Sequence, residues 1–439
     1  MRLIPKALKR MSYNNSKTKP RRVIADTPPP TYPGVHLLPT ELLLQIFGYL
    51  SDSMYADAFT FTRYYPAIAC VKNLVRGVDP SQGGLVSACS TSKNWCRHAT
   101  ALLYTTPFLT SHRAVESFAE TMAGSPELAA LVREVYVIEQ VQNAYTRYSR
   151  SELIKALRLC PSLNSLTITN RNRSFAPILP IDNLFAQASG ISDRLRKLTI
   201  YGSMYPCTPN FLSILTQTVT LPALEVLCIR EASLQFGFKL PILPNLHTLR
   251  MAQCHTWSGN SFQINSEQVP SLRTLELYET MPNVIIDDGI INNLERFHFI
   301  GEVHPGAYEP GTRKELRGSS LRHLAIGNVH CKHYDADWRI SPHIETLQVF
   351  ASSEILGDSI EQLGLLNLFP KMSLSEKDEP ISKLKEFTLW IGPQTPEKSY
   401  PALTAICDSL HTECNSRGAT FRVILDYQDV YITTRLLGD

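Results

Sequence analysis

The residues that could do metal chemistry are densest in the sequence HCKHYDAD, residues 330–337. Imidazole, thiolate and carboxylate groups at such short spacing could contact a divalent cation. A closed zinc site needs four ligands, however, and nothing else in the sequence supplies the companion ligands. We therefore interpret the stretch as a polar loop and predict no bound metal. The group comprises His330, Cys331, His333, Asp335 and Asp337.

Catalytic motifs are missing from the chain. It contains no G-x-S-x-G, no phosphate-binding loop, no G-x-G-x-x-G and no H-E-x-x-H. The acidic pair Asp287 and Asp288 precedes a glycine, which indicates turn chemistry rather than a catalytic pair of carboxylates. We predict a non-catalytic protein without a cofactor. A hydrolase built on an α/β domain is an alternative, but it would need a nucleophile and a base, and the sequence motifs supply neither.

Charge and hydrophobicity indicate a folded chain with a basic start. Of the 439 residues, 44% are hydrophobic and 19% are charged, and the formal net charge is +3. Residues 1–25 hold eight Lys or Arg and no acidic residue, whereas the remaining 414 residues hold 35 basic and 40 acidic side chains, a net of −5. The body therefore has no general attraction for nucleic acid. We interpret residues 1–34 as a disordered basic tail, with a nuclear import signal or a transit peptide as alternatives.

Cysteine usage and hydropathy bear on the cellular compartment. None of the ten cysteines forms a C-x-x-C pair, and most have apolar neighbours, which is typical of free thiols in a reducing compartment. The chain has no run of about 18 apolar residues, so no membrane span is predicted. We expect a location in the cytoplasm or the nucleus and no membrane partner.

One short pattern recurs ten times from residue 132 onward. An apolar residue is followed by two residues, a second apolar residue, one residue and a third apolar residue, and consecutive copies begin 22–40 residues apart. The last two apolar positions alternate with other residues, which is the period of a β-strand. The copies are VREVYV at 132, LNSLTI at 163, LRKLTI at 195, LEVLCI at 224, LHTLRM at 246, LRTLEL at 272, LERFHF at 294, LRHLAI at 321, IETLQV at 344 and LKEFTL at 384.

Each copy predicts one short strand followed by a connection of variable length. Because no copy can bury its apolar side alone, the copies must stack with their strands paired in parallel, as in a solenoid. Helices are expected at 150–160, 210–219 and 359–369, and a helix at 402–414 followed by a strand at 420–427 should end the array. A doubly wound sheet is the structural alternative, but helices of regular length are missing from residues 224–350.

A different apolar pattern precedes the repeats. The stretch HLLPTELLLQIFGYL, residues 36–50, begins like a helix, with Pro39 in the first turn and Glu41 where the helix dipole favours a negative charge. Its apolar residues cover roughly 220° of the helix circumference, about twice the arc that packing on one core requires. The helix is therefore either buried inside its own domain or placed between its own core and a partner.

The stretch LPTELLLQIFGYL resembles the first half of an F-box, whose signature is LPxELLxxIFxYL. The second half of the family pattern resembles residues 85–109, LVSACSTSKNWCRHATALLYTTPFL. We interpret residues 35–110 as an F-box with an insertion at 51–84, followed by a linking helix, HRAVESFAETMAG. The resemblance implies that the F-box docks onto a Skp-type adaptor, which joins it to a cullin-RING ubiquitin ligase. The residues expected at this contact are Leu38, Pro39, Leu42, Leu43, Ile46, Phe47, Leu50 and Trp95.

The repeats resemble leucine-rich repeats, which implies a curved parallel sheet in an irregular solenoid over residues 111–439. The Asn or Cys ladder position of that family holds Cys only in the fifth copy, at Cys254, so other hydrogen bonds must hold the turns. Outward strand positions carry aromatic, Arg and His residues, the kinds that dominate binding hot spots, and predict a target-binding face. An ordinary solvated sheet is the alternative. The expected residues are Tyr136, Tyr201, Arg230, Arg250, Tyr278, His298, His323, Phe350 and Trp390.

Together these patterns predict an α/β fold, in which a small helical F-box precedes an irregular leucine-rich-repeat solenoid. The expected function is substrate recognition for a Skp-cullin-F-box ubiquitin ligase, with the repeats holding an unidentified protein target. A scaffold that works with a Skp-type protein outside any ligase is the main alternative. Arg230, Arg250 and Arg296 on the predicted face would suit a phosphorylated target.

Overall fold

The computed structural model describes the chain in separate stretches. They are residues 80–91, 93–109, 112–139, 150–170, 185, 190–201, 221–230, 232–234, 239–252, 254–256, 262–278, 284–300, 315–316, 320–327, 339–340, 343–351, 383–391 and 400–425. The predicted basic tail, the predicted helices at 36–50, 210–219 and 359–369, and the HCKHYDAD stretch lie outside these residues. All expected adaptor contacts except Trp95 therefore lie outside them as well.

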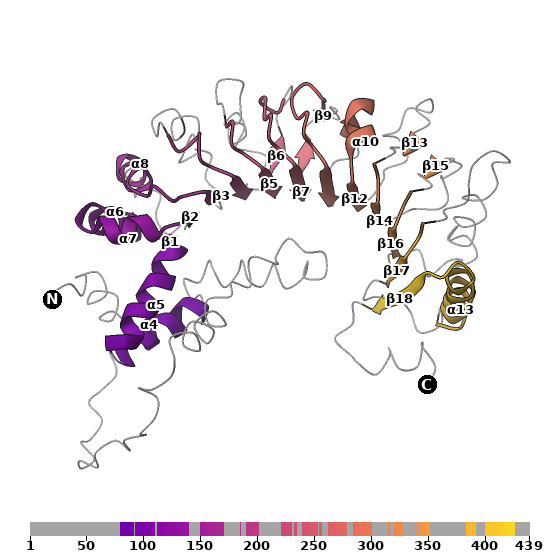
Figure 1. Cartoon of the computed structure of the whole chain (residues 1–439), viewed down its shortest axis with the longest axis horizontal. Coiled ribbons are helices and arrows are strands. Elements are labelled where there is room, and N and C mark those ends of the chain that lie inside the picture. Colours follow the sequence, from indigo (N-terminus) through magenta and orange to yellow (C-terminus); the bar gives the residue numbers. More distant parts are fainter. Residues whose placement is uncertain are drawn as a thin grey trace, which may run out of the picture. The chain divides into compact units, whose positions relative to one another are not determined.

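A parallel sheet of 12 strands dominates the described chain (Figure 1). The strands are neighbours in the order in which they occur in the sequence, and the first and last strands do not pair, so the sheet is open. The order is β1-β2-β3-β4-β5-β7-β10-β12-β14-β16-β17-β18. Each of the ten repeated patterns forms one strand, which begins two residues after the leading apolar residue. The predicted mixed α/β fold with parallel strands is confirmed. The bounds are β1 Phe108–Leu109, β2 Glu134–Glu139, β3 Ser165–Asn170, β4 Lys197–Tyr201, β5 Val226–Arg230, β7 Thr248–Ala252, β10 Thr274–Tyr278, β12 Arg296–Ile300, β14 His323–Gly327, β16 Thr346–Ala351, β17 Glu386–Ile391 and β18 Thr420–Leu425.

The repeated strands pair at equivalent positions of neighbouring copies. Leu249 of β7 is opposite Leu275 of β10, which is opposite Phe297 of β12, and all three are buried. Because side chains alternate along a strand, this register collects the apolar positions of every copy in one core and turns the intervening positions to the opposite face. We call that opposite side the outward face.

A backbone link just before each strand fixes this register. The carbonyl of Arg196 accepts the N–H groups of Glu225 and Val226 at 2.8 and 2.9 Å. The same pair of bonds recurs at each later copy up to the carbonyl of Glu345. The leading apolar residue is buried beside this link; Leu224, for example, is fully buried and donates its N–H to the carbonyl of Leu221.

The chain divides into two compact units, which are described separately. The first comprises Met1–Leu179 and Asn183–Leu195, and the second comprises Pro180–Asp182 and Arg196–Asp439. Strands β1, β2 and β3 belong to the first unit, and the strands from β4 onward belong to the second.

A pair of helices opens the described part of the first unit. Helix α4 spans Pro80–Thr91 and α5 spans Lys93–Thr105, so the region that matches the second half of the F-box pattern contains two helices. Helix α4 also begins inside the stretch predicted to be an insertion. The two helices share a small core of Leu85, Ala88 and Ala99, against which Cys89, Trp95, Leu102 and Leu103 pack.

Three more described helices of the first unit lie between its strands. Helix α6, His112–Gly124, is the predicted linking helix, α7 spans Pro126–Leu131, and α8, Arg150–Arg158, confirms the helix predicted at 150–160. Helices α6 and α8 pack against each other. Met122 of α6 and Leu153 and Leu157 of α8 are fully buried, so apolar burial holds this layer.

The described part of the second unit adds short parallel pairs and two helices to its strands. The pairs are β6 Ser233–Leu234 with β8 His255–Thr256, β9 Phe262–Ile264 with β11 Val284–Ile286, and β13 Glu315–Leu316 with β15 Arg339–Ile340. Helix α10 spans Asp288–Asn293. Helix α13, Tyr400–Ser416, precedes β18, which pairs with β17, so the helix and strand predicted at the end of the array are confirmed.

Side-chain hydrogen bonds between neighbouring copies hold the turns that precede two of the strands. The residue before the leading leucine donates to a proline carbonyl of the preceding copy: Asn245 Nδ2 to Pro222 at 2.7 Å, and Ser271 Oγ to Pro244 at 2.6 Å. At the one position that keeps a ladder cysteine, the buried thiol of Cys254 lies 3.5 Å from the carbonyl oxygen of Ile229 on β5. Polar side chains thus link successive copies on both sides of the strand.

The acidic pair forms a helix cap, as its interpretation as turn chemistry predicts. Asp287 is the N-cap of α10: its Oδ1 accepts the N–H of Gly289 at 3.0 Å. Its Oδ2 accepts the hydroxyl of Ser266 at 2.6 Å and the N–H of Ser266 at 3.1 Å. These bonds, the Ser266 hydroxyl foremost, lower the pKa of Asp287 below its ordinary value. One carboxylate therefore ties α10 to the turn that precedes β10.

Among the described helices, none has both the length and the apolar character that crossing a membrane requires.

Replacing the capping aspartate tests the link between α10 and the preceding turn. We expect Asp287→Ala to lower the free energy of unfolding by about 1–2 kcal/mol, because three N–H or O–H donors lose their acceptor. Urea denaturation followed by far-UV circular dichroism measures the change. Asp288→Ala, one residue later and exposed, is the matched control and should cost less than about 1 kcal/mol. Equal effects of the two substitutions would refute the capping role.

Candidate functional site

The outward face of the second unit carries four of the residues predicted to bind a target, Arg230, Arg250, His298 and His323. The strand register places equivalent positions side by side, so the side chains form rows that run across the strands. The middle row consists of Thr199, Cys228, Arg250, Glu276, His298, Ala325, Gln348, Thr388 and Arg422.

Much of this middle row is buried rather than solvated. Thr199, Glu276 and Thr388 are 1%, 3% and 2% exposed, and Arg230 in the next row is 6% exposed. Buried polar groups are costly unless they are hydrogen-bonded or ion-paired. Glu276 has its partner, Arg250, on the neighbouring strand, whereas the Thr388 hydroxyl donates to Glu386 on its own strand.

The strongest polar contact in the row joins β7 to β10. Arg250 Nε lies 2.9 Å from Glu276 Oε2, although the N–H bond is not aimed at that oxygen. The side chains are 28% and 3% exposed. Water screens this contact only weakly on the side of the carboxylate, which is almost fully buried.

His298 on β12 is a half-buried neutral imidazole next to these charges. Burial lowers its pKa to about 3, and the nearby charges of Arg296, Arg250 and His323 act in the same direction. The ring is uncharged at neutral pH and can accept a hydrogen bond at one nitrogen while it donates at the other.

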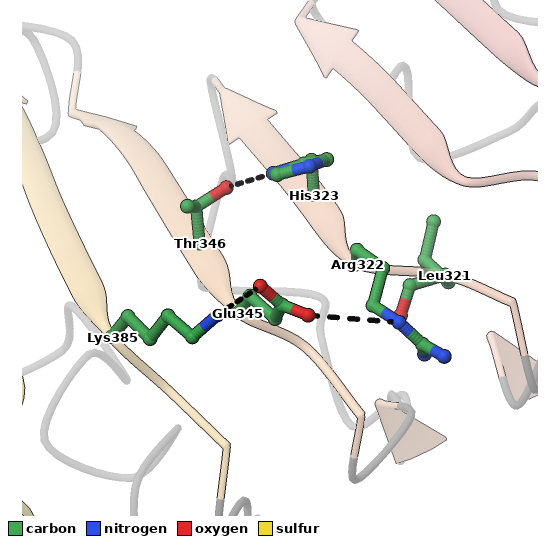
Figure 2. A network of polar contacts seen from close by, with 6 residues as sticks. All are labelled: Leu321, Arg322, His323, Glu345, Thr346 and Lys385. Atoms are coloured by element: carbon green, nitrogen blue, oxygen red, sulfur yellow. Dashed lines mark hydrogen bonds and ion pairs between the residues drawn. The ribbon is translucent and has the colours of Figure 1, made fainter.

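His323 lies in the neighbouring row, between Arg296 and Thr346, and contacts the next strand. Its Nδ1 lies 2.7 Å from the hydroxyl oxygen of Thr346 on β16, as Figure 2 shows. Burial lowers the pKa of His323, and Arg296 adds to the effect, while Glu345 and Glu295 oppose it. A neutral imidazole bonded to a hydroxyl is the state that this environment favours.

Charged side chains line the outer margin of the same strands, one position before each strand begins. Glu345 accepts a hydrogen bond from Lys385 Nζ at 2.6 Å, and one of its carboxylate oxygens lies 3.8 Å from Arg322 Nε. Figure 2 shows these three side chains, which belong to three successive copies. The Lys385 contact lowers the pKa of Glu345. Two further pairs have the same placement: Arg196 with Glu225 at 3.5 Å, and Arg273 with Glu295 at 2.9 Å.

Aromatic residues predicted for the face have different surroundings. Tyr136 on β2 is 8% exposed, because its ring stacks on Phe108 of β1 with centroids 4.6 Å apart. The side chains of Tyr201, Tyr278, Phe350 and Trp390 lie outside the described part of the structure, although their backbones belong to β4, β10, β16 and β17. Their roles in target binding stay predictions.

The three arginines considered for a phosphorylated target differ in accessibility. Arg230 is buried and Arg250 is ion-paired with Glu276, whereas Arg296 is exposed. Sequence periodicity placed all three on the outward face, but it does not show burial. The pairing of Arg250 with Glu276 could have been found, since the two residues occupy the same position of consecutive copies.

Trp95 is the one expected adaptor contact that the structure describes. It is half-buried and packs against the core shared by α4 and α5, so at least part of its side chain serves the fold of that helix pair. Its assignment to adaptor binding stays a prediction. Within the described ranges, no group of three or more His, Cys, Asp and Glu side chains could hold a metal ion.

Removing the carboxylate of the Arg250–Glu276 pair should destabilise the second unit. We expect Glu276→Gln to lower the free energy of unfolding by about 1–3 kcal/mol, because a half-buried guanidinium loses its counter-ion. Glu295→Gln is the matched control, since its pair with Arg273 has the same 2.9 Å separation but is 61% and 51% exposed. That change should cost less than about 1 kcal/mol. Urea denaturation compares them, and similar losses would contradict a special role for burial.

The pKa of His298 predicts a pH-dependent stability. In the unfolded chain this imidazole takes up a proton as the pH falls below 6.5, whereas in the folded chain it stays neutral until about pH 3. Stability is therefore complete above pH 6.5 and is lost toward pH 3, with a slope approaching about 1.4 kcal/mol per pH unit. We expect His298→Asn to flatten the decline between pH 6.5 and 5, measured by urea denaturation at each pH. If the free energy of unfolding falls equally with pH in the wild type and in His298→Asn, His298 is not the cause of the decline.

Comparison with known protein families concerns the first part of the chain. Residues 35–110 match the family model described as F-box-like. This range contains α4 and α5, the shared core of Leu85, Ala88 and Ala99, and the half-buried Trp95. No curated protein matches the chain. The family match therefore supports an F-box protein through this domain.

Proposed function

We propose that this protein is a non-catalytic substrate-recognition subunit of a Skp-cullin-F-box ubiquitin ligase. The observation that carries the proposal is the F-box-like match over residues 35–110. F-box domains bind Skp-type adaptors, and through them a cullin-RING ligase. The apolar residues Leu38, Leu42, Leu43, Ile46 and Phe47 would provide most of the adaptor contact, because an apolar arc wider than one core needs is suited to a second partner.

The remaining chain would hold the protein to be modified. Its parallel sheet presents in-register rows, which suit a partner that runs along or across several strands at once. Solvent-accessible Arg296 and Arg422 and the half-buried Gln348 are the polar candidates among the described outward residues. Tyr201, Tyr278, Phe350 and Trp390 would add aromatic contacts of the kind that dominate hot spots. The repeats would then act as the leucine-rich-repeat-like recognition domain of residues 111–439.

The contribution of such a subunit to ubiquitin transfer is proximity. Binding the target and the ligase through two parts of one chain raises the local concentration of the target near the ubiquitin-charged enzyme. No catalytic group, metal or cofactor is needed on this chain for that role. Such a complex would work in the cytoplasm or the nucleus.

Co-purification with the adaptor tests the proposal directly. The full-length chain and a Skp-type adaptor from the same organism should elute together on size exclusion. We expect Leu42→Asp/Ile46→Asp to weaken the complex at least roughly tenfold, because a charge placed in an apolar contact must be desolvated without a partner. Ile242→Asp is the control, since this isoleucine is 69% exposed in the second unit and should leave binding unchanged.

The same complex distinguishes a ligase from a scaffold. Circular dichroism first establishes that each variant is folded. If the folded wild-type chain elutes without the adaptor, the proposed function is wrong. Recovery of the adaptor together with cullin from a cell extract supports the ligase, whereas recovery of the adaptor without cullin would contradict it.

A further inference from the structure

Two cysteine side chains converge where α4 meets α5. Cys89 lies near the end of α4, Cys96 lies in the first turn of α5, and one residue separates the helices. The Cys89 sulfur is 3.7 Å from the hydroxyl oxygen of Thr100, and the Cys96 sulfur is 3.8 Å from the same atom. The two thiols also interact with each other. The helix pair thus brings two sulfur atoms to one point without a metal-ligand group around them.

Exposure sets these two thiols apart from the other described cysteines. Cys89 and Cys96 are half-buried, so small reagents can reach them. The buried cysteines are Cys160, Cys228, Cys254, Cys407 and Cys414. Thiol oxidation depends on access and on the thiolate form.

The buried cysteines and Cys89 also differ in how readily they form the thiolate. Burial raises the pKa of Cys160 to about 12 and the pKa values of Cys407 and Cys414 to about 11, which makes these thiols unreactive. Burial also raises the pKa of Cys89, but its hydrogen bond with Thr100 acts in the opposite direction. Oxidation at Cys89 is therefore slow at neutral pH rather than blocked.

We propose that Cys89 and Cys96 form a reversible disulfide that cross-links α4 to α5, with a low-molecular-weight disulfide such as oxidised glutathione as the oxidant. One cysteine thiolate attacks the glutathione disulfide, forms a mixed disulfide and releases one glutathione thiolate. The second cysteine thiolate attacks the protein sulfur of that mixed disulfide and releases the other glutathione. Two protein thiols are oxidised, one glutathione disulfide is reduced to two thiols, and the protons pass to the released thiolates.

Helix geometry explains why this pair can bridge when another pair at the same spacing cannot. Cys407 and Cys414 are also seven residues apart, but both lie on α13. A rise of 1.5 Å per residue separates them by about 10 Å along the helix axis, beyond the roughly 7 Å between Cα atoms that a disulfide spans. Cys89 and Cys96 escape this limit because they lie on two different helices that pack against each other.

The cross-link would fix one end of a helix pair that belongs to the F-box-like range. Leu85 and Ala88 of α4 and Ala99 of α5 form its shared core, so the angle between the helices decides how that core packs. Oxidation would thereby restrict the domain that the proposed function assigns to adaptor binding. This consequence rests on the proposed function, whereas the disulfide itself does not.

Peptide mapping of the full-length protein tests the disulfide. The folded chain is incubated with millimolar oxidised glutathione, blocked with N-ethylmaleimide under denaturing conditions and digested with trypsin without reductant. Trypsin cuts after Lys93 and Arg97, so Cys89 and Cys96 fall in separate peptides, 77–93 and 94–97. We expect these two peptides to be joined, and to separate on reduction. In the same digest, peptide 399–417 should carry both Cys407 and Cys414 as blocked thiols.

Single substitutions distinguish a disulfide from accidental modification. Cys89→Ser removes the resolving thiol, so a mixed disulfide with glutathione should accumulate on Cys96 in this variant and not in the wild type. Circular dichroism checks that the variant is folded. Two results in the wild type would overturn the proposal. In the first, the two peptides are separate and both cysteines are blocked by N-ethylmaleimide; in the second, the peptides are separate and glutathione is retained, as in the variant. Because mapping uses the chain without its adaptor, either result leaves the adaptor test of the proposed function unaffected.

Discussion

The structure depends on parallel pairing without a shift between consecutive copies of one short pattern. A single carbonyl, such as that of Arg196, accepts the two N–H groups that begin the next copy, and this bond pair recurs up to Glu345. Because the side-chain period of a strand is two, a slip by one residue would turn every buried leucine outward. The backbone link and the apolar core therefore enforce the same register, and that register determines which side chains meet on the outward face.

Charges beside the backbone link reinforce the order of the copies. The position after the leading apolar residue alternates in sign along most of the second unit: Arg196, Glu225, His247, Arg273, Glu295, Arg322, Glu345 and Lys385. Exposed ion pairs of this kind each contribute little to stability. A wrong pairing of copies two apart would instead oppose like charges, which is unfavourable between adjacent strands. The row thus favours the native neighbours more than it strengthens any one of them.

The sequence predicted the strands well because each signal is local. Every copy contains its own alternation, and the residues before it contain the turn, so all ten strands could be placed. Contacts between copies carry weaker signals. The bond of Ser266 to Asp287 joins residues 21 positions apart, and the sequence shows only that Asp287 precedes a turn.

Burial of the outward face limits how a target could be recognised there. Arg250 already faces Glu276 at 2.9 Å, and His298 is held neutral, so neither provides a free charge at neutral pH. A partner that bound Arg250 through its own anion would have to compete with a carboxylate that is 3% exposed and costly to leave unpaired. Ionic recognition through Arg250 would therefore gain little net energy. A target bound on this face would have to be held by side chains outside the Arg250–Glu276 pair.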